Sequence, residues 1–296
     1  MVEAISNLVF QGGGVKGIAY ARALAALERR AELCAVQGIA GASAGAFTAM
    51  LVAIGCDAAA IARIATGTDY AALEDHFDPL RLATHYGIYR GEALHEWIAG
   101  AFATTGLDQR LSFAALAAAT GRDLRVFATD LTQRTAREFS ARATPRVPVV
   151  DAVRASMSIP LMFPAWRFAA GEPDDHLYVD GGVVMNYPIA AFDEHDPPEA
   201  TLGFRLVPGS QPVPIPGDRN HPAAYVHALF GAILAAQAID VSAQPRDRLR
   251  SVSIDDFGIA ATGFRLTAAQ QQALFESGRR ATDAFLDARA SRSGAA

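Results

Sequence analysis

Residues 39–47 read IAGASAGAF, and this stretch joins an apolar run to a helix-forming run through a turn of small residues. The apolar run 36–40 predicts a buried strand, and the run 44–54 predicts a helix. Ser43 has a glycine two positions away on each side, at Gly41 and Gly45, which is the pattern G-x-S-x-G. A strand, a sharp turn and a helix in this order are typical of a parallel sheet covered by helices.

The same rhythm continues along the chain, because short apolar runs bounded by turn residues alternate with longer helical patterns. Strands are predicted at 8–10, 36–40, 124–129, 138–140, 177–179, 201–207 and 251–254. Helices are predicted at 19–30, 44–54, 58–64, 92–102, 113–119, from 150, at 225–239 and from 267. The last helix starts with a capping box, since Gln270 follows Thr267 by three residues. The alternation predicts an α/β fold with three layers, α/β/α, around a mostly parallel central sheet.

The domain organisation follows from what lies after the proline-rich stretch 208–222. This stretch resembles a linker, but the three elements after it are too few for an independent core. We therefore expect one domain over 1–289, with the core motifs in 8–208 and a less diagnostic part in 209–289. The small and polar residues 290–296 are predicted to be a frayed tail.

Composition excludes several classes of protein. The formal net charge of -5 and the sequence pI near 5.8 predict no basic face, so nucleic acid is not expected as a partner. The two cysteines, Cys34 and Cys56, lie among apolar residues and are predicted to be buried free thiols rather than a disulfide framework.

The first residues, MVEAISNLVF, lack the pattern of a secretory signal, which favours a cytoplasmic location. The run 33–56 contains no charged residue and is long enough on paper to cross a bilayer. Its four glycines and its turn pattern instead predict a buried strand and a buried helix.

A glycine-rich loop, QGGGVKG at 11–17, follows the first predicted strand. Gly12, Gly14 and Gly17 match G-x-G-x-x-G, so a dinucleotide-binding loop is one hypothesis. That hypothesis requires an acidic residue at the end of the second strand, but the strand runs into Gly41, and Glu32 lies before it. The spacing of a P-loop is not met either.

The second hypothesis for this loop is an oxyanion hole. The N–H groups of Gly12, Gly13 and Gly14 would point at a developing negative charge near a helix N-terminus. Lys16 has two equally supported interpretations, as a contributor to the positive field beside Gly17 or as a solvated loop residue.

Ser43 also has two interpretations. A nucleophile elbow holds its serine in a strained turn and needs small neighbours, which Gly41, Ala42, Ala44 and Gly45 provide. The alternative is a serine that caps the helix N-terminus. The apolar strand before it, the helix after it and the upstream glycine loop favour the elbow.

A nucleophilic serine needs a group that accepts its proton. His195, His221 and His227 follow Ser43 in the chain order of the α/β-hydrolases, but each is explained by its surroundings as a surface or packing residue. Asp180 ends the apolar run 177–179 and precedes two glycines, which predicts a carboxylate at the carboxyl edge of the sheet.

The glycines after this aspartate, Gly181 and Gly182, leave its carboxylate uncrowded. Partial burial would raise the pKa of Asp180 toward working pH, where it can act as a base. The alternative is an ordinary Asp-Gly turn between two strands.

Taken together, GGGVKG, GASAG and DGG in this order resemble the motifs of the patatin-like phospholipase family of Ser-Asp lipid acyl hydrolases. GIYRGEALHEWI (87–98), ATDL (128–131) and RASMSIPLMFPAW (154–166) also look like blocks of that family. The likeness covers roughly the first two thirds of the chain, since nothing diagnostic follows position 208.

The resemblance implies a patatin-like fold, with Ser43 as nucleophile, Asp180 as its sole protein partner and the loop from Gly12 to Gly17 as the oxyanion site. Lys16 stands where the family often has arginine. The resemblance also implies hydrolysis of a phospholipid or other acyl lipid without calcium, other metal or cofactor. Peripheral membrane contact is a further expectation, and no oligomeric state is predicted.

Two rival functions stay open at this point, a histidine-dependent carboxylesterase and a nucleotide-binding module that uses GGGVKG. The apolar residues of the block at 159–166 have two interpretations as well. They would line an acyl pocket or contact lipid, or they would simply be buried in the core.

Overall fold

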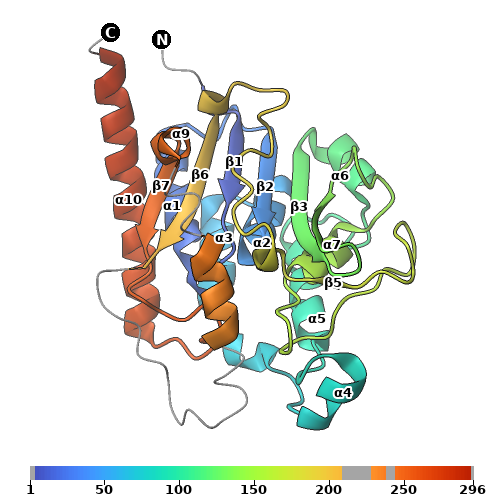
Figure 1. Ribbon diagram of the computed structural model, residues 1–296. Coiled ribbons are helices and arrows are strands. Elements are labelled where there is room, and N and C mark those ends of the chain that lie inside the picture. The colour runs from blue at the N-terminus through green and yellow to red at the C-terminus, as the bar shows by residue number, and fades with distance from the viewer. Residues whose placement is uncertain (1–3, 209–227, 238–243, 295–296) are drawn as a thin grey trace.

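The computed structural model describes residues 4–208, 228–237 and 244–294 (Figure 1). A seven-stranded sheet runs through its centre, with the strand order β4-β3-β2-β1-β6-β7 and with β5 paired to β3. The strands are β1 (Asn7–Phe10), β2 (Gly38–Ala42), β3 (Asp123–Asp130), β4 (Thr135–Phe139), β5 (Tyr178–Val179), β6 (Thr201–Val207) and β7 (Ser251–Asp255).

Five of these strands, β3, β2, β1, β6 and β7, run parallel to one another. The two others, β4 and β5, are antiparallel to β3. Helices flank the sheet, which confirms the predicted α/β fold with a mostly parallel sheet. The carboxyl ends of the parallel strands all point to the lower end of the molecule in Figure 1.

Most of the longer helices lie between strands in the sequence, and the last one follows β7. They are α1 (Ala19–Arg29), α2 (Ala44–Ala53), α3 (Ala58–Gly67), α5 (Glu92–Gly100), α6 (Phe113–Thr120), α7 (Val149–Ser156) and α10 (Ala268–Gly294). Shorter turns are η1 (Gly14–Ile18), η2 (Tyr70–Leu73), η3 (Pro79–Arg81), α4 (Leu82–His85), η4 (Ala101–Thr104), η5 (Gly181–Val183), η6 (Pro198–Ala200) and α9 (Pro245–Leu249). Residues 228–237 form a further helical segment.

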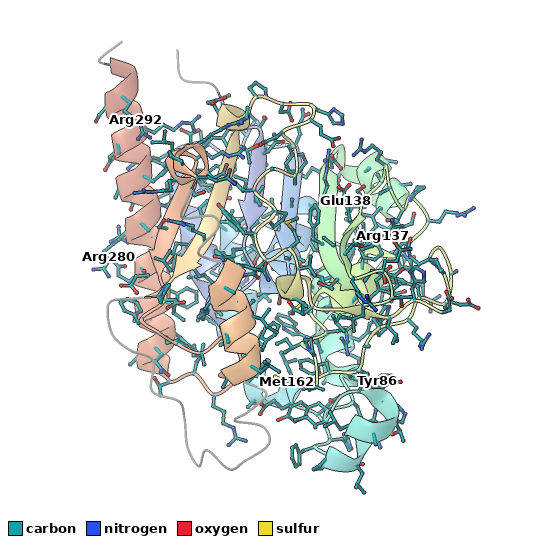
Figure 2. The ribbon with its side chains drawn as sticks, in the orientation of Figure 1. Tyr86, Arg137, Glu138, Met162, Arg280 and Arg292 are labelled. Carbon is teal, nitrogen blue, oxygen red and sulfur yellow. The ribbon has the colours of Figure 1, made fainter. Side chains whose placement is uncertain are left out.

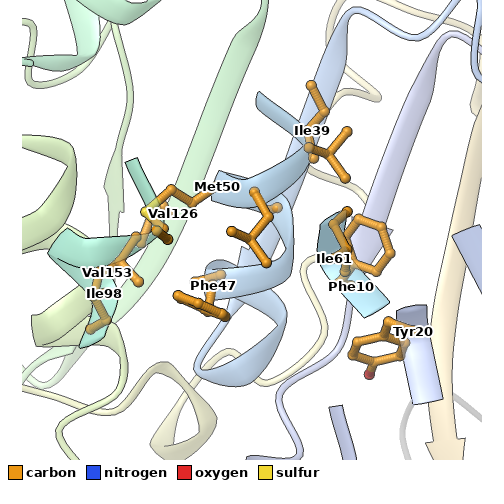
Figure 3. Close-up of a cluster of buried hydrophobic side chains, with 14 of the residues drawn as sticks. Phe10, Tyr20, Ile39, Phe47, Met50, Ile61, Ile98, Val126 and Val153 are labelled. Atoms are coloured by element: carbon orange, nitrogen blue, oxygen red, sulfur yellow. The ribbon is translucent and has the colours of Figure 1, made fainter. Parts of the chain in front are cut away.

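The main core lies between the sheet and these helices (Figure 3). Alternate strand residues such as Leu8, Phe10 and Ile39 point into it. Helix α2 has no exposed face, since all ten of its residues are buried. A helix that is apolar all round belongs at the centre of the structure, which explains why the uncharged run 33–56 is so long.

The opposite face of the sheet has a smaller core. Val9, Ala40 and Phe127 point to this side and pack against Tyr187 and other residues of the stretch 187–192. That stretch is an irregular chain rather than a helix. The two outer layers therefore differ in construction.

Several element boundaries differ from the predictions. The second strand is β2, Gly38–Ala42, rather than 36–40, because its register with β1 pairs Asn7 with Gly38 and extends through the small residues that resembled a turn. The predicted strand 138–140 is β4, Thr135–Phe139, because a hairpin aligns it with β3. The expected tail from 290 is helical as far as Gly294.

The predicted capping box is confirmed, since the Gln270 N–H donates to Thr267 Oγ1 at 3.2 Å and the Thr267 N–H donates to Gln270 Oε1 at 2.9 Å. The prediction of two buried thiols was wrong for Cys34, which is exposed, whereas Cys56 is half-buried. Cys34 lies in the surface turn that ends α1, where local apolar composition does not lead to burial.

Strands β6 and β7 complete the same sheet as β1, and α10 packs on α1 and β7. The one-domain organisation over 1–289 stays a prediction, which this shared sheet supports. The proline-rich stretch 208–222 lies outside the described residues except for Pro208. Among the helices of the described ranges, none has the length and apolar character needed to cross a membrane.

Candidate active site

Ser43 and Asp180 are brought together by two strands that meet end to end on one side of β3. Strand β2 runs parallel to β3 and its last residue, Ala42, pairs with Phe127. Strand β5 runs antiparallel to β3, and Val179 pairs with Thr129, two residues further along. The carboxyl ends of β2 and β5 therefore point at each other. The residue that follows β2 is Ser43, and the residue that follows β5 is Asp180.

The turn at Ser43 has the backbone of a nucleophile elbow. Its φ of 52° and ψ of -127° lie where side chains are strained. A Cβ at Gly41 would lie 2.3 Å from the Gly45 carbonyl oxygen, and a Cβ at Gly45 would lie 2.2 Å from the Phe10 carbonyl oxygen. Both positions thus have room only for glycine. The Ser43 side chain does not cap α2.

The Ser43 hydroxyl donates a hydrogen bond to Asp180 Oδ2 at 2.7 Å. The other carboxylate oxygen, Oδ1, accepts the Gly182 N–H at 2.7 Å. Ser43 is 3% exposed and Asp180 is fully buried. Burial raises the pKa of Asp180 from 3.8 to about 7, although the hydrogen bonds from Ser43 and Gly182 oppose that rise. A carboxylate with a pKa near neutrality is suited to act as a general base.

The block RASMSIP holds both residues in place, a role that sequence reasoning missed. The Ser156 hydroxyl accepts the Ser43 N–H at 2.8 Å and donates to the Phe127 carbonyl at 2.6 Å. The Ser158 carbonyl accepts the Asp180 N–H at 2.9 Å. Because Ser156 and Ser158 lie in and just after α7, one short segment fixes the backbone of the hydroxyl and of the carboxylate.

The glycine loop lies against the elbow. A Cβ at Gly12 would lie 3.1 Å from Ser43 Cβ. The Gly12 N–H already donates to the Asn186 carbonyl at 2.9 Å, so it is not a free oxyanion donor. The N–H groups of Gly13 and Gly14 have no hydrogen-bond partner among the described residues. Gly14 has a φ of +56°, and a Cβ there would lie 1.9 Å from the Ala261 carbonyl oxygen.

Lys16 fits neither of its two interpretations fully, because it is engaged in an ion pair. Its Nζ lies 2.6 Å from Asp256 Oδ2, and only 14% of the lysine side chain and 4% of the aspartate side chain are exposed. The pair ties the loop to the segment after β7. Gly17 packs against the elbow, since a Cβ there would lie 3.0 Å from Ala44 Cβ.

Asn186 and Gln237 are two further site residues that sequence reasoning missed. Asn186 is 2% exposed, and its Oδ1 has no hydrogen-bond partner among the described residues. A Cβ at Gly12 or at Gly182 would lie within 3.0 Å of that oxygen, so the amide lies between the two glycine loops. Gln237 Oε1 accepts the Asn186 N–H at 2.7 Å, and its Nε2 donates to the Gly182 and Val183 carbonyls.

No histidine of the described ranges contacts the Ser43 hydroxyl. His195 is exposed and lies in the loop before β6, at the amino end of that strand and far from the elbow. His221 and His227 lie outside the described residues. Within the described ranges, no group of three or more histidine, cysteine, aspartate or glutamate side chains is arranged to hold a metal ion.

A predominantly apolar cavity opens beside Ser43, between α1, α2, α3 and α5. Its volume is about 60 Å³, several times the ~10–15 Å³ that one water molecule requires. Its lining includes Phe47, Leu51, Ile61, Leu73, Trp97 and Phe163. The Phe47 and Trp97 rings stack with their centroids 3.9 Å apart.

The apolar block at 159–166 divides between its two interpretations. Ile159 and Phe163 line the cavity beside Ser43. Met162 is buried, and Leu161 and Trp166 are half-buried. The block therefore serves the cavity at some positions and the core at others.

This chain is similar to several known proteins. The model of a family described as patatin-like phospholipase matches residues 8–193. The uncharacterised Bacillus subtilis protein YqhO is 32% identical over 298 residues, a match that covers 94% of this chain and 97% of that protein. An uncharacterised protein of Acanthamoeba polyphaga mimivirus is 27% identical over 284 residues, covering 93% and 91% of the two chains.

Two solved structures share the fold. The structure of VipD from Legionella pneumophila matches with a TM-score of 0.65 and 20% identity, covering 97% of this chain and 67% of that one. The type III effector ExoU matches with a TM-score of 0.55 and 17% identity, covering 97% of this chain and 53% of that one. This chain thus spans about half the length of ExoU.

Proposed function

This chain belongs to the patatin-like phospholipase family, and we propose that it cleaves ester bonds of phospholipids or other acyl lipids through Ser43 and Asp180. Membership in the family supports lipid acyl hydrolysis as the general activity. The single observation that most supports the finer assignment is the 2.7 Å hydrogen bond from Ser43 Oγ to a fully buried carboxylate.

The first half-reaction forms an acyl-enzyme. Ser43 Oγ attacks the carbonyl carbon of the ester while its proton moves to Asp180 Oδ2. The negative charge that develops on the carbonyl oxygen is held by backbone N–H groups, with Gly13 and Gly14 as the donors. When the tetrahedral intermediate collapses, Asp180 returns the proton to the leaving alkoxide, and the alcohol part of the lipid departs.

The second half-reaction releases the fatty acid. A water molecule replaces the alcohol, and Asp180 takes one of its protons as the oxygen attacks the acyl carbon. Collapse of the second intermediate breaks the bond to Ser43 Oγ, which takes the proton back from Asp180. The enzyme returns to its starting state, and the reaction consumes one water for each ester bond.

The cavity beside Ser43 supports an acyl chain as the group held during both steps. Apolar side chains of α2 and α3, such as Phe47, Leu51 and Ile61, line it next to the hydroxyl. A predominantly apolar pocket with few polar groups favours a hydrocarbon chain over a charged or sugar-like group. Peripheral contact with a membrane follows as part of the proposal, since acyl lipids reside in bilayers.

The proposal is tested by covalent labelling. An organophosphonate should modify the purified protein, and mass spectrometry of the peptides should locate the label on Ser43. The Ser43→Ala variant should take no label while keeping the circular dichroism spectrum of the wild type. A label on another residue, or no label on the folded wild type, would contradict the assignment.

A matched set of variants separates the Ser-Asp hydrolase from a histidine-dependent carboxylesterase. His195→Asn, His221→Asn and His227→Asn should each keep most of the hydrolysis of short acyl esters, whereas Asp180→Asn should lose it. A loss of about a thousandfold from any one histidine variant would favour a triad instead.

A further inference from the structure

Within the described ranges, large hydrophobic side chains are exposed mainly at one end of the molecule. Ten of the described large hydrophobic side chains are exposed, and nine of them lie on segments at the lower end of the molecule in Figure 1, to which the carboxyl ends of the parallel strands point. We call this set the carboxyl-end face, and its members are Phe77, Leu80, Leu82, Tyr86, Leu131, Val184, Met185, Leu229 and Phe257. The tenth, Leu249, precedes β7 at the opposite end.

The most exposed part of this face is the segment 76–86, which contains η3 and α4 and protrudes at the lower end of the molecule (Figures 1 and 2). Leu80 is 83% exposed, and Phe77 and Tyr86 are each 54% exposed. A side chain with this exposure contributes little to the core, so the folding of this chain does not explain why leucine and aromatic residues occupy these positions.

The protruding segment is held at its base. The Asp78 N–H donates to the Ile88 carbonyl at 2.9 Å, and the Arg90 N–H donates to the Asp75 carbonyl at 3.2 Å. Asp75 Oδ1 also accepts the Gly91 N–H at 2.7 Å, at the start of α5. The tip therefore presents its apolar side chains from a fixed attachment.

A row of aromatic rings leads from this segment to the cavity. The Phe77 ring lies 6.0 Å from the Tyr89 ring, and the Tyr89 ring lies 5.9 Å from the Phe163 ring, measured between centroids. Phe163 lines the cavity that contains Ser43. Three neighbouring rings thus connect the exposed segment with a side chain that lines the cavity.

Two segments of this face carry no net formal charge. Within 76–86 the single aspartate, Asp78, offsets the single arginine, Arg81, and the helical segment 228–237 contains no charged residue. The whole chain carries a net charge of -5, which would repel an anionic surface. The partner that fits this face therefore has an apolar interior covered by a surface without net charge.

We propose that the carboxyl-end face docks on a lipid bilayer, with Leu80 and Tyr86 inserted among the lipids. This inference rests on the proposed function, because a docked enzyme would receive an acyl chain from the bilayer along the row from Phe77 to Phe163. The chain would then reach Ser43 without crossing bulk water. Binding by apolar insertion depends little on salt and does not require anionic lipid.

The test compares two ends of the molecule on vesicles of pure phosphatidylcholine, in a Ser43→Ala background that prevents hydrolysis. The double variant Leu80→Ser/Tyr86→Ser should partition onto the vesicles about 100-fold more weakly, which is roughly tenfold for each large side chain removed. Leu249→Ser, the matched control at the opposite end, should partition like the parent. Raising NaCl from about 0.1 M to 1 M should change the parent by less than about twofold.

A second measurement places the inserted residue directly. Leu80→Trp should shift its fluorescence to the blue on phosphatidylcholine vesicles and should be quenched by brominated lipid, whereas Leu249→Trp should do neither. Unchanged partitioning of the double variant would overturn the proposal. The proposal would also be overturned if light scattering showed a dimeric parent and a monomeric double variant. Binding that requires anionic lipid would overturn it as well.

Failure of this inference differs from failure of the proposed function. With Ser43 restored, Leu80→Ser/Tyr86→Ser should hydrolyse a soluble short acyl ester within about twofold of the wild type and should take the organophosphonate label. The double variant could keep labelling and soluble hydrolysis and also bind vesicles as strongly as the parent. That result would support the hydrolase assignment and contradict the docking surface.

Discussion

At the amino ends of the parallel strands the buried charges are paired, whereas at the carboxyl ends a buried carboxylate faces a serine hydroxyl. Arg250, just before β7, lies 2.6 Å from Asp193 and 2.7 Å from Asp247, and only 6% of its side chain is exposed. Asp180 has no ion pair within the described ranges and has a pKa raised to about 7. Satisfied groups stabilise a fold, while a strained and desolvated site costs stability and provides reactivity.

The largest effect that would test this contrast is the loss of activity in Asp180→Asn. An asparagine side chain cannot accept the Ser43 proton, so kcat/KM for a soluble short acyl ester should fall about 10⁴-fold. Asp193→Asn, a carboxylate removed from the opposite end, should keep the activity of the folded enzyme. Full activity in Asp180→Asn would show that another group is the base.

Next in size is the loss of stability in Arg250→Met. Removing the cation leaves Asp247 without its partner and Asp193 with only Arg246, at 3.9 Å, which should lower the free energy of unfolding by about 3–5 kcal/mol. Denaturant titration measures the change, and active-site labelling of the remaining folded protein should be unchanged. A loss below about 1 kcal/mol would mean that the pairs at the amino end do not stabilise the fold as argued.

Replacing Asp180 should increase stability instead of lowering it, and the size of the increase should depend on pH. Because its pKa is about 7 in the folded protein and 3.8 in the reference state, the folded protein binds the extra proton between these values. Its contribution to stability is therefore full below pH 3.8 and is lost as the pH rises through 7. From pH 5 to pH 8, Asp180→Asn should gain on the order of 2–3 kcal/mol relative to wild type in denaturant titrations.

A smaller effect on kcat should distinguish two buried serines, Ser156 near the site and Ser251 at the opposite end. Ser156→Ala leaves the Ser43 N–H and the Phe127 carbonyl without a partner and should cost about 1–3 kcal/mol of stability. It should also lower kcat about tenfold or more, because the elbow loses its anchor. Ser251→Ala at the amino end, where the hydroxyl bonds to Asp247 and Tyr187, should cost similar stability but leave kcat unchanged.

The smallest predicted effect is the pH dependence of the wild type. Asp180 must be ionised to take the Ser43 proton, so kcat/KM for a soluble ester should be half-maximal near pH 7. Below that pH it should fall about tenfold per unit. Asp193→Asn should leave the profile in place, and a plateau that extends down to pH 5 would exclude Asp180 as the titrating base.

Local sequence patterns predicted the positions of strands and helices better than they predicted how the strands pair. The strand before Ser43, the helix after it and the strand before Asp180 were all expected, because each is encoded by a short apolar run. The direction of β5 was not expected. Asp180 was predicted from the carboxyl-edge rule of parallel sheets, yet it lies at the site because an antiparallel strand points back toward Ser43.

The partners of the loop residues depended on contacts between distant segments. Lys16 pairs with Asp256, 240 positions away, and the Gly12 N–H bonds to the Asn186 carbonyl. Neither contact produces a local pattern in the sequence. A signal was present for Ser156, since it lies in the block RASMSIP, but nothing in that block indicates which backbone group the hydroxyl would contact.

The end-to-end meeting of β2 and β5 has a consequence for biosynthesis. The hydroxyl and the carboxylate are 137 positions apart in the chain, and β3, which aligns them, is made between the two. If Asp180 is the base, as proposed, a nascent polypeptide that has emerged only through α6 contains the serine without that base. On the proposed mechanism, hydrolysis therefore becomes possible only after β5 has been made and has met β2 beside β3.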